Sequence, residues 1–354
     1  MYDAIIVGAG PIGCKLGELL GKENINTIIL EEHPEIGKPA HCTGLVSHRI
    51  PKLSGASSDV IVNKVKKASF YSFDKNYLEL KSRKKVYVID RVKFDEELSE
   101  LAKNYVEIKT STRFEDFKRK RNYIAVKTKK EILKSKILIG ADGPNSTVAY
   151  NARIKLPDNI LTGLQVRIKS KYKTDGVELW FSKEISSDFF GWVVPENEEW
   201  ARVGIATSDN VVKHLNYFLN HRFGKKIEPK DNTAGRIRFG LIKDSVSSNV
   251  LLVGDAATQV KPFSGGGLIY GLIGARVANE ACIKAFEKEK YSYKFLKENY
   301  DEVWRQKLSW PITKGLLYSK IIHSLSDNQL SFLFSTLNKT RMRKLLEFTD
   351  MDLL

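Results

Sequence analysis

The chain has 354 residues, with 58 Lys and Arg against 42 Asp and Glu, so its formal net charge is +16. Hydrophobic residues make up 42 % and aromatic residues 10 % of the chain, which argues against a disordered, collagen-like or coiled-coil protein and predicts two lobes, or one large domain with an insertion. No apolar run reaches the roughly 18 residues of a membrane-spanning helix, so none is expected.

The first 31 residues predict a strand, a tight turn, a helix and a second strand. Residues 4–7 are apolar and β-prone, and the glycine-rich segment 8–13 follows them. Leucines then recur at helical spacing from Leu16, and 27–30 is again apolar and ends at Glu31. A glycine motif in this setting is typical of dinucleotide-binding folds.

Each glycine of this turn has a different expected task. Gly8 permits the tight turn, Gly10 lets the backbone approach a pyrophosphate, and Gly13 lets helix and strand pack closely. The helix N-terminus then faces the phosphates, and Glu31 is placed to accept hydrogen bonds from a ribose. The residues of this segment predicted to bind the cofactor are Gly8, Gly10, Pro11, Ile12, Gly13, Glu31 and Glu32.

The densest basic cluster, residues 118–121, lies between two strand-like segments, 112–117 and 122–128. It therefore predicts a solvated hairpin turn. Because no recognition helix or RNA-binding signature accompanies it, we expect no nucleic-acid partner.

Two further strand-and-turn segments follow. Residues 137–140 lead into an Asp-Gly turn, and residues 251–253 lead into a Gly-Asp turn followed by a triple glycine and a helix over 268–281. Such a turn can present one carboxylate to a chain of hydroxyls, and the helix N-terminus can direct N–H groups at an electron-rich ring. The predicted cofactor-binding residues here are Ala141, Asp142, Gly143, Gly254, Asp255, Pro262, Gly265, Gly266, Gly267 and Leu268.

Three motifs in this order, near positions 8, 142 and 255, resemble the flavoprotein class of p-hydroxybenzoate hydroxylase. The resemblance implies that the cofactor is FAD. Asp255 would then bind the ribityl chain, and the turn 265–267 would lie against the pyrimidine edge of the flavin. Arg91 resembles the cofactor-facing arginine that opens a helix in this class; its alternative is an ion pair with Asp95.

A narrower resemblance, to the geranylgeranyl reductase family, rests on three segments. These are residues 35–39 together with Cys42-Thr43-Gly44, residues 90–95, and the aromatic motif 190–195 with 204–206. The resemblance implies that Cys42, Thr43 and Gly44 lie beside the flavin and that the enzyme saturates isolated C=C bonds of prenyl chains. The aromatic motif departs from the family pattern at Val194 and Ala206, so the shape of the substrate is less determined than the fold.

We therefore predict an α/β fold: a Rossmann-like FAD-binding domain with an inserted, mainly antiparallel β-sheet substrate domain and a C-terminal helical region. The expected boundaries are 1–50, 80–150 and 235–290 for the FAD-binding domain, 51–79 and 151–234 for the substrate domain, and 291–354 for the helical region.

Reduction of an isolated alkene needs a hydride from reduced flavin and a proton from elsewhere, so the protein mainly aligns the reactants. Aromatic residues between 180 and 192 suit a long prenyl chain; the alternative is ordinary core. The predicted substrate-binding residues are Trp180, Phe181, Phe190, Trp192 and Pro195. The catalytic candidates are Trp192 and Cys42, whose thiol is either a proton donor or a packing element.

Cysteine and histidine usage predicts no metal centre. Cys14, Cys42 and Cys282 are too few for a disulfide framework or a four-thiolate iron–sulfur cluster, and the six histidines show no metal-site spacing. A second alternative, an electron-transfer flavoprotein that reduces quinone, would therefore lack the iron–sulfur cluster that carries its electrons.

The main alternative is an FAD-dependent monooxygenase, a hydroxylase or epoxidase of an apolar substrate. Ala149 stands where those hydroxylases place an arginine, which weakens this alternative. The expected partners are a prenyl lipid or prenyl diphosphate and an external electron donor, with NADPH, ferredoxin and reduced deazaflavin all open. The N-terminus lacks a signal-peptide pattern, so we expect a cytoplasmic protein, and its charge allows peripheral contact with an anionic membrane surface.

Overall fold

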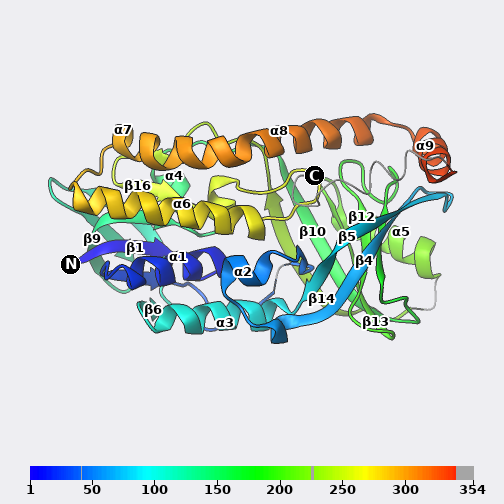
Figure 1. Cartoon of the computed structure of the whole chain (residues 1–354), viewed down its shortest axis with the longest axis horizontal. Helices are drawn as coiled ribbons and strands as arrows, with labels where there is room; N and C mark the ends of the chain where they lie inside the picture. The colour runs from blue at the N-terminus through cyan, green and yellow to red at the C-terminus, as the bar shows by residue number, and fades with distance from the viewer. Residues whose placement is uncertain (41, 225–226, 340–354) are drawn as a thin grey trace.

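The computed structural model describes residues 1–40, 42–224 and 227–339. It contains two eight-stranded sheets at opposite ends of an elongated molecule, with long helices packed along the first sheet and across to the second (Figure 1). The predicted α/β fold with an inserted, mainly antiparallel sheet is confirmed. Residues 340–354 of the predicted helical region lie outside the described residues.

The first sheet holds the nucleotide-binding topology. Its central strand β1 (Tyr2–Val7) pairs in parallel with β2 (Thr27–Leu30) and with β9 (Ile132–Gly140). The apolar run from Ala4 to Val7 is buried, as expected for a parallel strand covered on both faces. The other strands of this sheet are β6 (Glu107–Lys109), β7 (Phe114–Arg119), β8 (Ile124–Thr128), β15 (Val246–Ser247) and β16 (Val250–Leu252). Because β7 and β8 pair antiparallel, the predicted hairpin is confirmed, but its turn spans 120–123, since Lys118 and Arg119 belong to β7.

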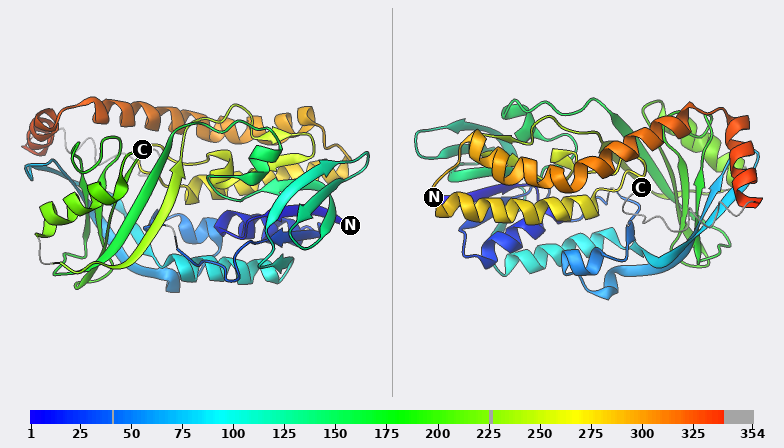
Figure 2. Two further views of the ribbon diagram at one scale, coloured as in Figure 1. Left: turned by 180° about the vertical axis from the view of Figure 1, so that it is seen from behind. Right: turned by 45° about the horizontal axis from the view of Figure 1, so that its top comes forward.

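The second sheet has the order β14-β10-β13-β12-β11-β4-β5-β3 and is antiparallel except where β11 pairs with β4. Figure 2 shows it from behind and from above. Its strands are β3 (Leu45–Ser47), β4 (Ile61–Tyr71), β5 (Tyr77–Ile89), β10 (Ile160–Lys169), β11 (Gly176–Trp180), β12 (Gly191–Pro195), β13 (Trp200–Thr207) and β14 (Lys230–Arg238).

Sheet membership differs from the predicted boundaries at three strands. β3, most of β5 and the end of β14 lie in residues that the sequence predicts for the FAD-binding domain, but they pair within the second sheet. The cause is strand pairing: β5 folds back on β4 as one long hairpin, and β3 joins its outer edge. The division into domains stays a proposal.

The long helices connect the two sheets. α1 (Pro11–Lys22), α3 (Arg91–Lys103) and α6 (Leu268–Glu287) pack beside the first sheet, while α8 (Glu302–Ser324) runs along one edge of the molecule and ends beside the second (Figures 1 and 2). α9 (Asp327–Lys339) follows α8 and packs on β4 and β5. The remaining α-helices are α2 (Ile50–Ser54), α4 (Thr147–Asn151), α5 (Val211–Phe223) and α7 (Tyr293–Leu296).

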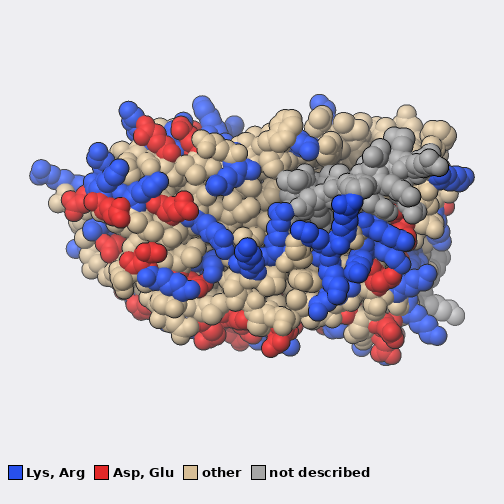
Figure 3. All heavy atoms as spheres, viewed as in Figure 1, with Lys and Arg blue, Asp and Glu red and all other residues tan. Residues whose placement is uncertain are grey.

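The surface carries the basic excess unevenly. On the face seen in Figure 3, Lys and Arg side chains gather over β4 and β5, while the edge formed by α8 is mostly uncharged. Among the described residues, no helix is both long and apolar enough to cross a membrane.

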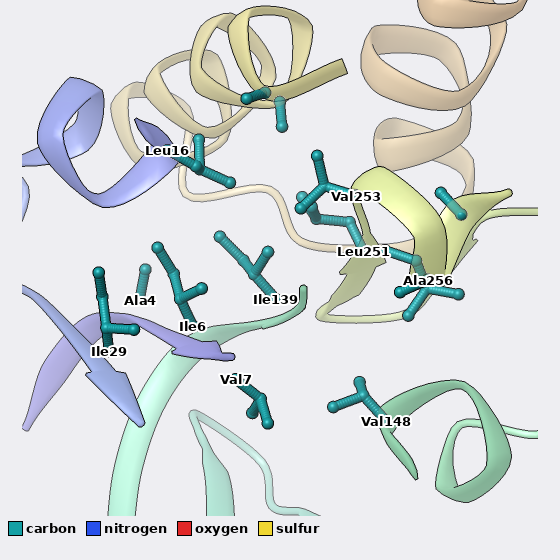
Figure 4. Packing of buried hydrophobic residues seen from close by; sticks show 14 of the residues in the cluster. Ala4, Ile6, Val7, Leu16, Ile29, Ile139, Val148, Leu251, Val253 and Ala256 are labelled. Atoms are coloured by element: carbon teal, nitrogen blue, oxygen red, sulfur yellow. The ribbon is translucent and has the colours of Figure 1, made fainter. Parts of the chain in front are cut away.

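The core of the first sheet forms where parallel strands meet α1. Side chains of Ile6, Ile29, Ile139 and Leu251 come from four different strands and point into one space, which Leu16 of α1 closes (Figure 4). All five are fully buried. This packing fixes the carboxyl ends of the strands, and each predicted motif follows such an end.

Candidate functional site

The glycine turn after β1 has the geometry of a nucleotide cradle. Gly8 has φ +103°, and an added Cβ would overlap the backbone of Ala141; at Gly13 it would overlap the Gly8 carbonyl. Gly10, by contrast, is the N-cap of α1 with no side-chain cap, and an added Cβ there would meet nothing within 4 Å. Two glycines therefore serve the fold, while Gly10 leaves open space at a helix N-terminus, as a bound pyrophosphate requires.

Glu31 lies beside this turn. Its carboxylate accepts hydrogen bonds from the Ala9 N–H (2.8 Å) and the His33 N–H (2.9 Å). Glu32 does not join it, because its exposed side chain pairs with Arg113 at 3.5 Å. Pro11 and Ile12 begin α1, and Ile12 packs against Gly254 and Gly271, so the first and third motifs touch.

Asp142 fastens its own turn. Its carboxylate accepts hydrogen bonds from the Ser146 hydroxyl (2.6 Å) and the Val148 N–H (3.0 Å), so it holds the first turn of α4, whose N-cap is Ser146. Burial raises its pKa, and these donors oppose the rise. Gly143 has φ +77°, and an added Cβ there would meet nothing within 4 Å. The Ala141 N–H donates a hydrogen bond to the Val7 carbonyl, next to Gly8. The sequence does not reveal this internal use of the carboxylate.

Asp255, in the 3-10 turn Gly254–Ala257 after β16, is free to bind a ligand. No hydrogen bond to its partly buried carboxylate is found among the residues that the structure describes. Burial raises its pKa to about 6, and nearby Arg91 opposes that rise. Gly267 packs directly against this carboxylate. An unpaired acceptor in such a place fits the hydroxyl chain of a flavin cofactor.

Arg91 connects the motifs. It opens α3, whose N-cap Asp90 accepts the Val92 N–H at 3.0 Å, and it forms two hydrogen bonds with Asp95, at 3.0 and 2.9 Å. The alternative ion pair is therefore present. Burial lowers the pKa of Arg91. Asp95 and the Cys42 sulfur, which contacts the guanidinium, together raise this pKa by a larger amount, so the net shift is upward. Arg91 therefore contacts Cys42 and acts electrostatically on Asp255.

The Cys42-Thr43-Gly44 turn is tied to the second sheet by residues that sequence reasoning missed. Cys42 is exposed, and its sulfur accepts the Gly44 N–H at 3.3 Å. The Thr43 hydroxyl donates to Gln165 Oε1 at 2.8 Å, and the same oxygen accepts the Trp192 Nε1–H at 3.0 Å. No signal in the sequence singled out Gln165, because its strand β10 also carries Thr162, Arg167 and Lys169.

The predicted aromatic wall is only partly assembled. Phe181, Phe189, Phe190 and Trp192 share one cluster, with ring centroids 5.3 Å apart for Phe181–Phe190 and 4.1 Å for Phe189–Phe190. Trp180 is not among them. It packs on the other face of the sheet, 4.5 Å from Tyr71, because neighbouring residues of an extended chain face opposite ways.

The aromatic cluster adjoins the turn after β16. An added Cβ at Gly265 would lie 3.3 Å from Phe189, and Phe263 stacks on Phe181 at 6.4 Å. Gly266 follows in this turn, and Leu268 begins α6. Pro262 packs against Gly315 of α8. Pro195 ends β12, where its carbonyl accepts the Asn63 amide, away from this cluster. An apolar wall therefore meets the predicted flavin turn.

Comparison with known proteins supports this geometry. An uncharacterised protein of Methanocaldococcus jannaschii is 30 % identical over 350 residues, covering 96 % of this chain and 89 % of its own. A digeranylgeranylglycerophospholipid reductase of Methanosarcina acetivorans is 26 % identical over 372 residues, covering 98 % and 90 %. The crystal structure of a geranylgeranyl bacteriochlorophyll reductase-like protein from Thermoplasma acidophilum has a TM-score of 0.89 at 24 % identity, covering 99 % and 94 %.

The family comparison identifies the cofactor. The FAD binding domain model matches residues 1–275, a range that includes the glycine turn, Arg91 and both later turns. The free Asp255 carboxylate and the open space at Gly10 suit the ribityl and pyrophosphate parts of FAD. The chain therefore belongs to the FAD binding domain family, and its cofactor is FAD.

Proposed function

We propose that this protein is an FAD-dependent reductase that saturates isolated C=C bonds of geranylgeranyl chains in membrane lipid biosynthesis. The observation that carries the proposal is the apolar aromatic cluster against the turn 265–267. A prenyl chain offers no hydrogen bonds, so a protein must hold it by shape and apolar contact. The reductase names of several relatives support the same substrate class.

The aromatic side chains hold the substrate. Phe181, Phe190 and Trp192 come from one sheet and lie in one cluster. Trp192 is fixed by its hydrogen bond to Gln165, so its ring keeps one orientation. Burial of this wall excludes water from the alkene, which leaves the choice of proton donor to the protein.

FAD, when bound and reduced, supplies a hydride to one alkene carbon. The other carbon needs a proton, and we assign it to the Cys42 thiol, which lies on the turn that carries Thr43 and Gly44. The Arg91 guanidinium contacts this sulfur. The hydride and proton together add one H2 across the double bond, and water then reprotonates the sulfur.

The decisive experiment measures reoxidation of the flavin without oxygen. The holoenzyme is reduced with dithionite and mixed with a geranylgeranyl lipid or geranylgeranyl diphosphate. The flavin should return to its oxidised spectrum only with prenyl substrate, and mass spectrometry should find one added H2 per reduced bond. Reduced enzyme that ignores every prenyl substrate yet inserts oxygen into one in air would establish the monooxygenase alternative. Ala149, fully buried where hydroxylases place an arginine, favours the reductase.

A cysteine pair tests the proton donor. Cys42→Ser should keep FAD and slow alkene reduction more than flavin reduction, and stopped-flow absorbance separates these half-reactions. The matched control is Cys282→Ser, because Cys282 is buried on α6 away from the turn. An unchanged reoxidation rate in Cys42→Ser would assign the thiol to packing.

The electron donor and the location are parts of the same proposal. NADPH, ferredoxin and reduced deazaflavin are the candidate donors, and the rate of flavin reduction by each compares them directly. We place the protein in the cytoplasm, and its net charge of +16 supports peripheral association with the inner face of an anionic membrane.

A further inference from the structure

The outer face of α8 and the start of α9 carry large apolar side chains in the open. Trp310, Leu317 and Ile321 are 70 %, 54 % and 51 % exposed, and Phe332 of α9 is 73 % exposed. The spacing from 310 to 317 to 321 follows helical repeats, so the α8 side chains share one stripe. We call these four residues the α8–α9 stripe. Contiguous exposed apolar residues mark an interaction surface.

The charges around the stripe identify its partner. In α8 and α9 the basic residues are Arg305, which pairs with Asp301, and Lys307, Lys314, Lys320 and Lys339, while the acidic residues are Glu302 in the first turn of α8 and Asp327. Asp327 is already engaged by the Ser182 hydroxyl and the Lys183 N–H. From Trp310 to Ile321 the sequence holds two lysines and no acidic residue, which is the composition of a surface that enters the headgroup region of an anionic bilayer. An apolar protein partner would not require this bias.

The inner faces of α8 and α9 contact the aromatic cluster that contains Phe181 and Trp192. Gly315 packs against Pro262 beside the turn 265–267, and Phe334 of α9 contacts Phe181 with ring centroids 5.9 Å apart. Leu330 and Ile322 pack in the same cluster. One pair of helices therefore touches the aromatic wall on one side and presents exposed apolar residues on the other.

We infer that the α8–α9 stripe docks on the surface of an anionic bilayer, so that a prenyl lipid passes from the bilayer to the aromatic cluster beneath these helices. This inference rests on the proposed function for its substrate, but vesicle binding tests it independently. The edge in question is the mostly uncharged one over α8 in Figure 3.

The first test uses the FAD-loaded full chain with vesicles of phosphatidylcholine alone or mixed with phosphatidylglycerol. Wild type should cosediment with the anionic vesicles and bind less at high salt. The triple variant Trp310→Ser, Leu317→Ser, Ile321→Ser should bind at least about tenfold more weakly, because three apolar side chains leave the interface. The matched control, Ile132→Ser with Tyr150→Ser, removes equally exposed side chains from the first lobe and should bind as wild type. Equal binding by the triple variant, or equal loss in the control, overturns the inference.

A second measurement uses the fluorescence of the protein's own tryptophans. Trp310 is exposed, Trp200 is half-buried on β13 with Arg167 over its ring, and Trp180, Trp192 and Trp304 are buried. Brominated lipids in anionic vesicles should therefore quench tryptophan fluorescence through Trp310, and the loss of quenching in Trp310→Phe would confirm its position. Binding without quenching would place the membrane contact elsewhere and overturn the inference.

Enzyme turnover distinguishes this inference from the proposed function. The triple variant should reduce geranylgeranyl diphosphate in solution at the wild-type rate but lose reduction of a vesicle-embedded lipid. If neither protein reduces any prenyl compound, the proposed function fails, and the vesicle assays still decide the docking surface. A wild-type dimer that becomes a monomer in the triple variant, with vesicle binding unchanged, would show that the stripe pairs two copies of the chain.

Discussion

Two alanine substitutions in the glycine turn separate cofactor binding from folding. At Gly13 an added methyl group would overlap the Gly8 carbonyl oxygen and lie 3.3 Å from Ala141 Cβ. Backbone atoms cannot rotate away, so we expect overpacking to exceed the roughly 1 kcal/mol that alanine gains in a helix, for a net loss of about 2 kcal/mol. At Gly10, φ is −67° and the space is open. The loss of a glycine N-cap and the reduced entropy of the unfolded chain are each below about 1 kcal/mol and nearly cancel.

The assay measures both quantities on each variant. Urea unfolding of flavin-free protein should show Gly10→Ala unchanged and Gly13→Ala destabilised. Visible absorbance after gel filtration should show that Gly10→Ala has lost FAD, with affinity at least about tenfold weaker because the methyl group keeps the pyrophosphate from the helix N-terminus. Full flavin content in Gly10→Ala, or an equal loss of stability in both flavin-free variants, would refute the division of roles.

Three further changes test the site. Burial raises the pKa of Asp255 from 3.8 to about 6. Because the pKa is higher in the folded state, the stability of flavin-free protein should fall as the pH rises from 3.8 to about 6. Asp255→Asn should remove this fall and gain at most about 3 kcal/mol at neutral pH in chemical unfolding. Buried Asp301 pairs with Arg305 at 2.6 Å, so Asp301→Ala should cost about 3–5 kcal/mol by calorimetry, and a change within error would contradict this. Gln165→Leu leaves the Trp192 N–H unpaired and should cost about 2 kcal/mol and alter the tryptophan fluorescence, while Gln165→Glu, which keeps the acceptor oxygen, restores both.

The sequence by itself determined the features that consecutive residues encode. The strand, glycine turn and helix at the N-terminus follow from glycine spacing and apolar periodicity, because each turn depends on local backbone geometry. The strands leading to Asp142 and Asp255 were predicted for the same reason. The resemblance of the three motifs to a known flavoprotein class implied that they share FAD, and the family that residues 1–275 match confirms this cofactor.

Only the tertiary structure decided which of these segments meet. The Thr43 hydroxyl donates a hydrogen bond to Gln165, which lies 122 positions further along the chain. No local sequence pattern predicts a contact over that separation. Strand pairing likewise placed β5 in the second sheet, and the packing of distant elements decided that Phe181, and not Trp180, faces the aromatic cluster. The periodicity of apolar residues predicts which side chains are buried. The residues that they pack against depend on how distant elements meet, and this packing determines the shape of the site.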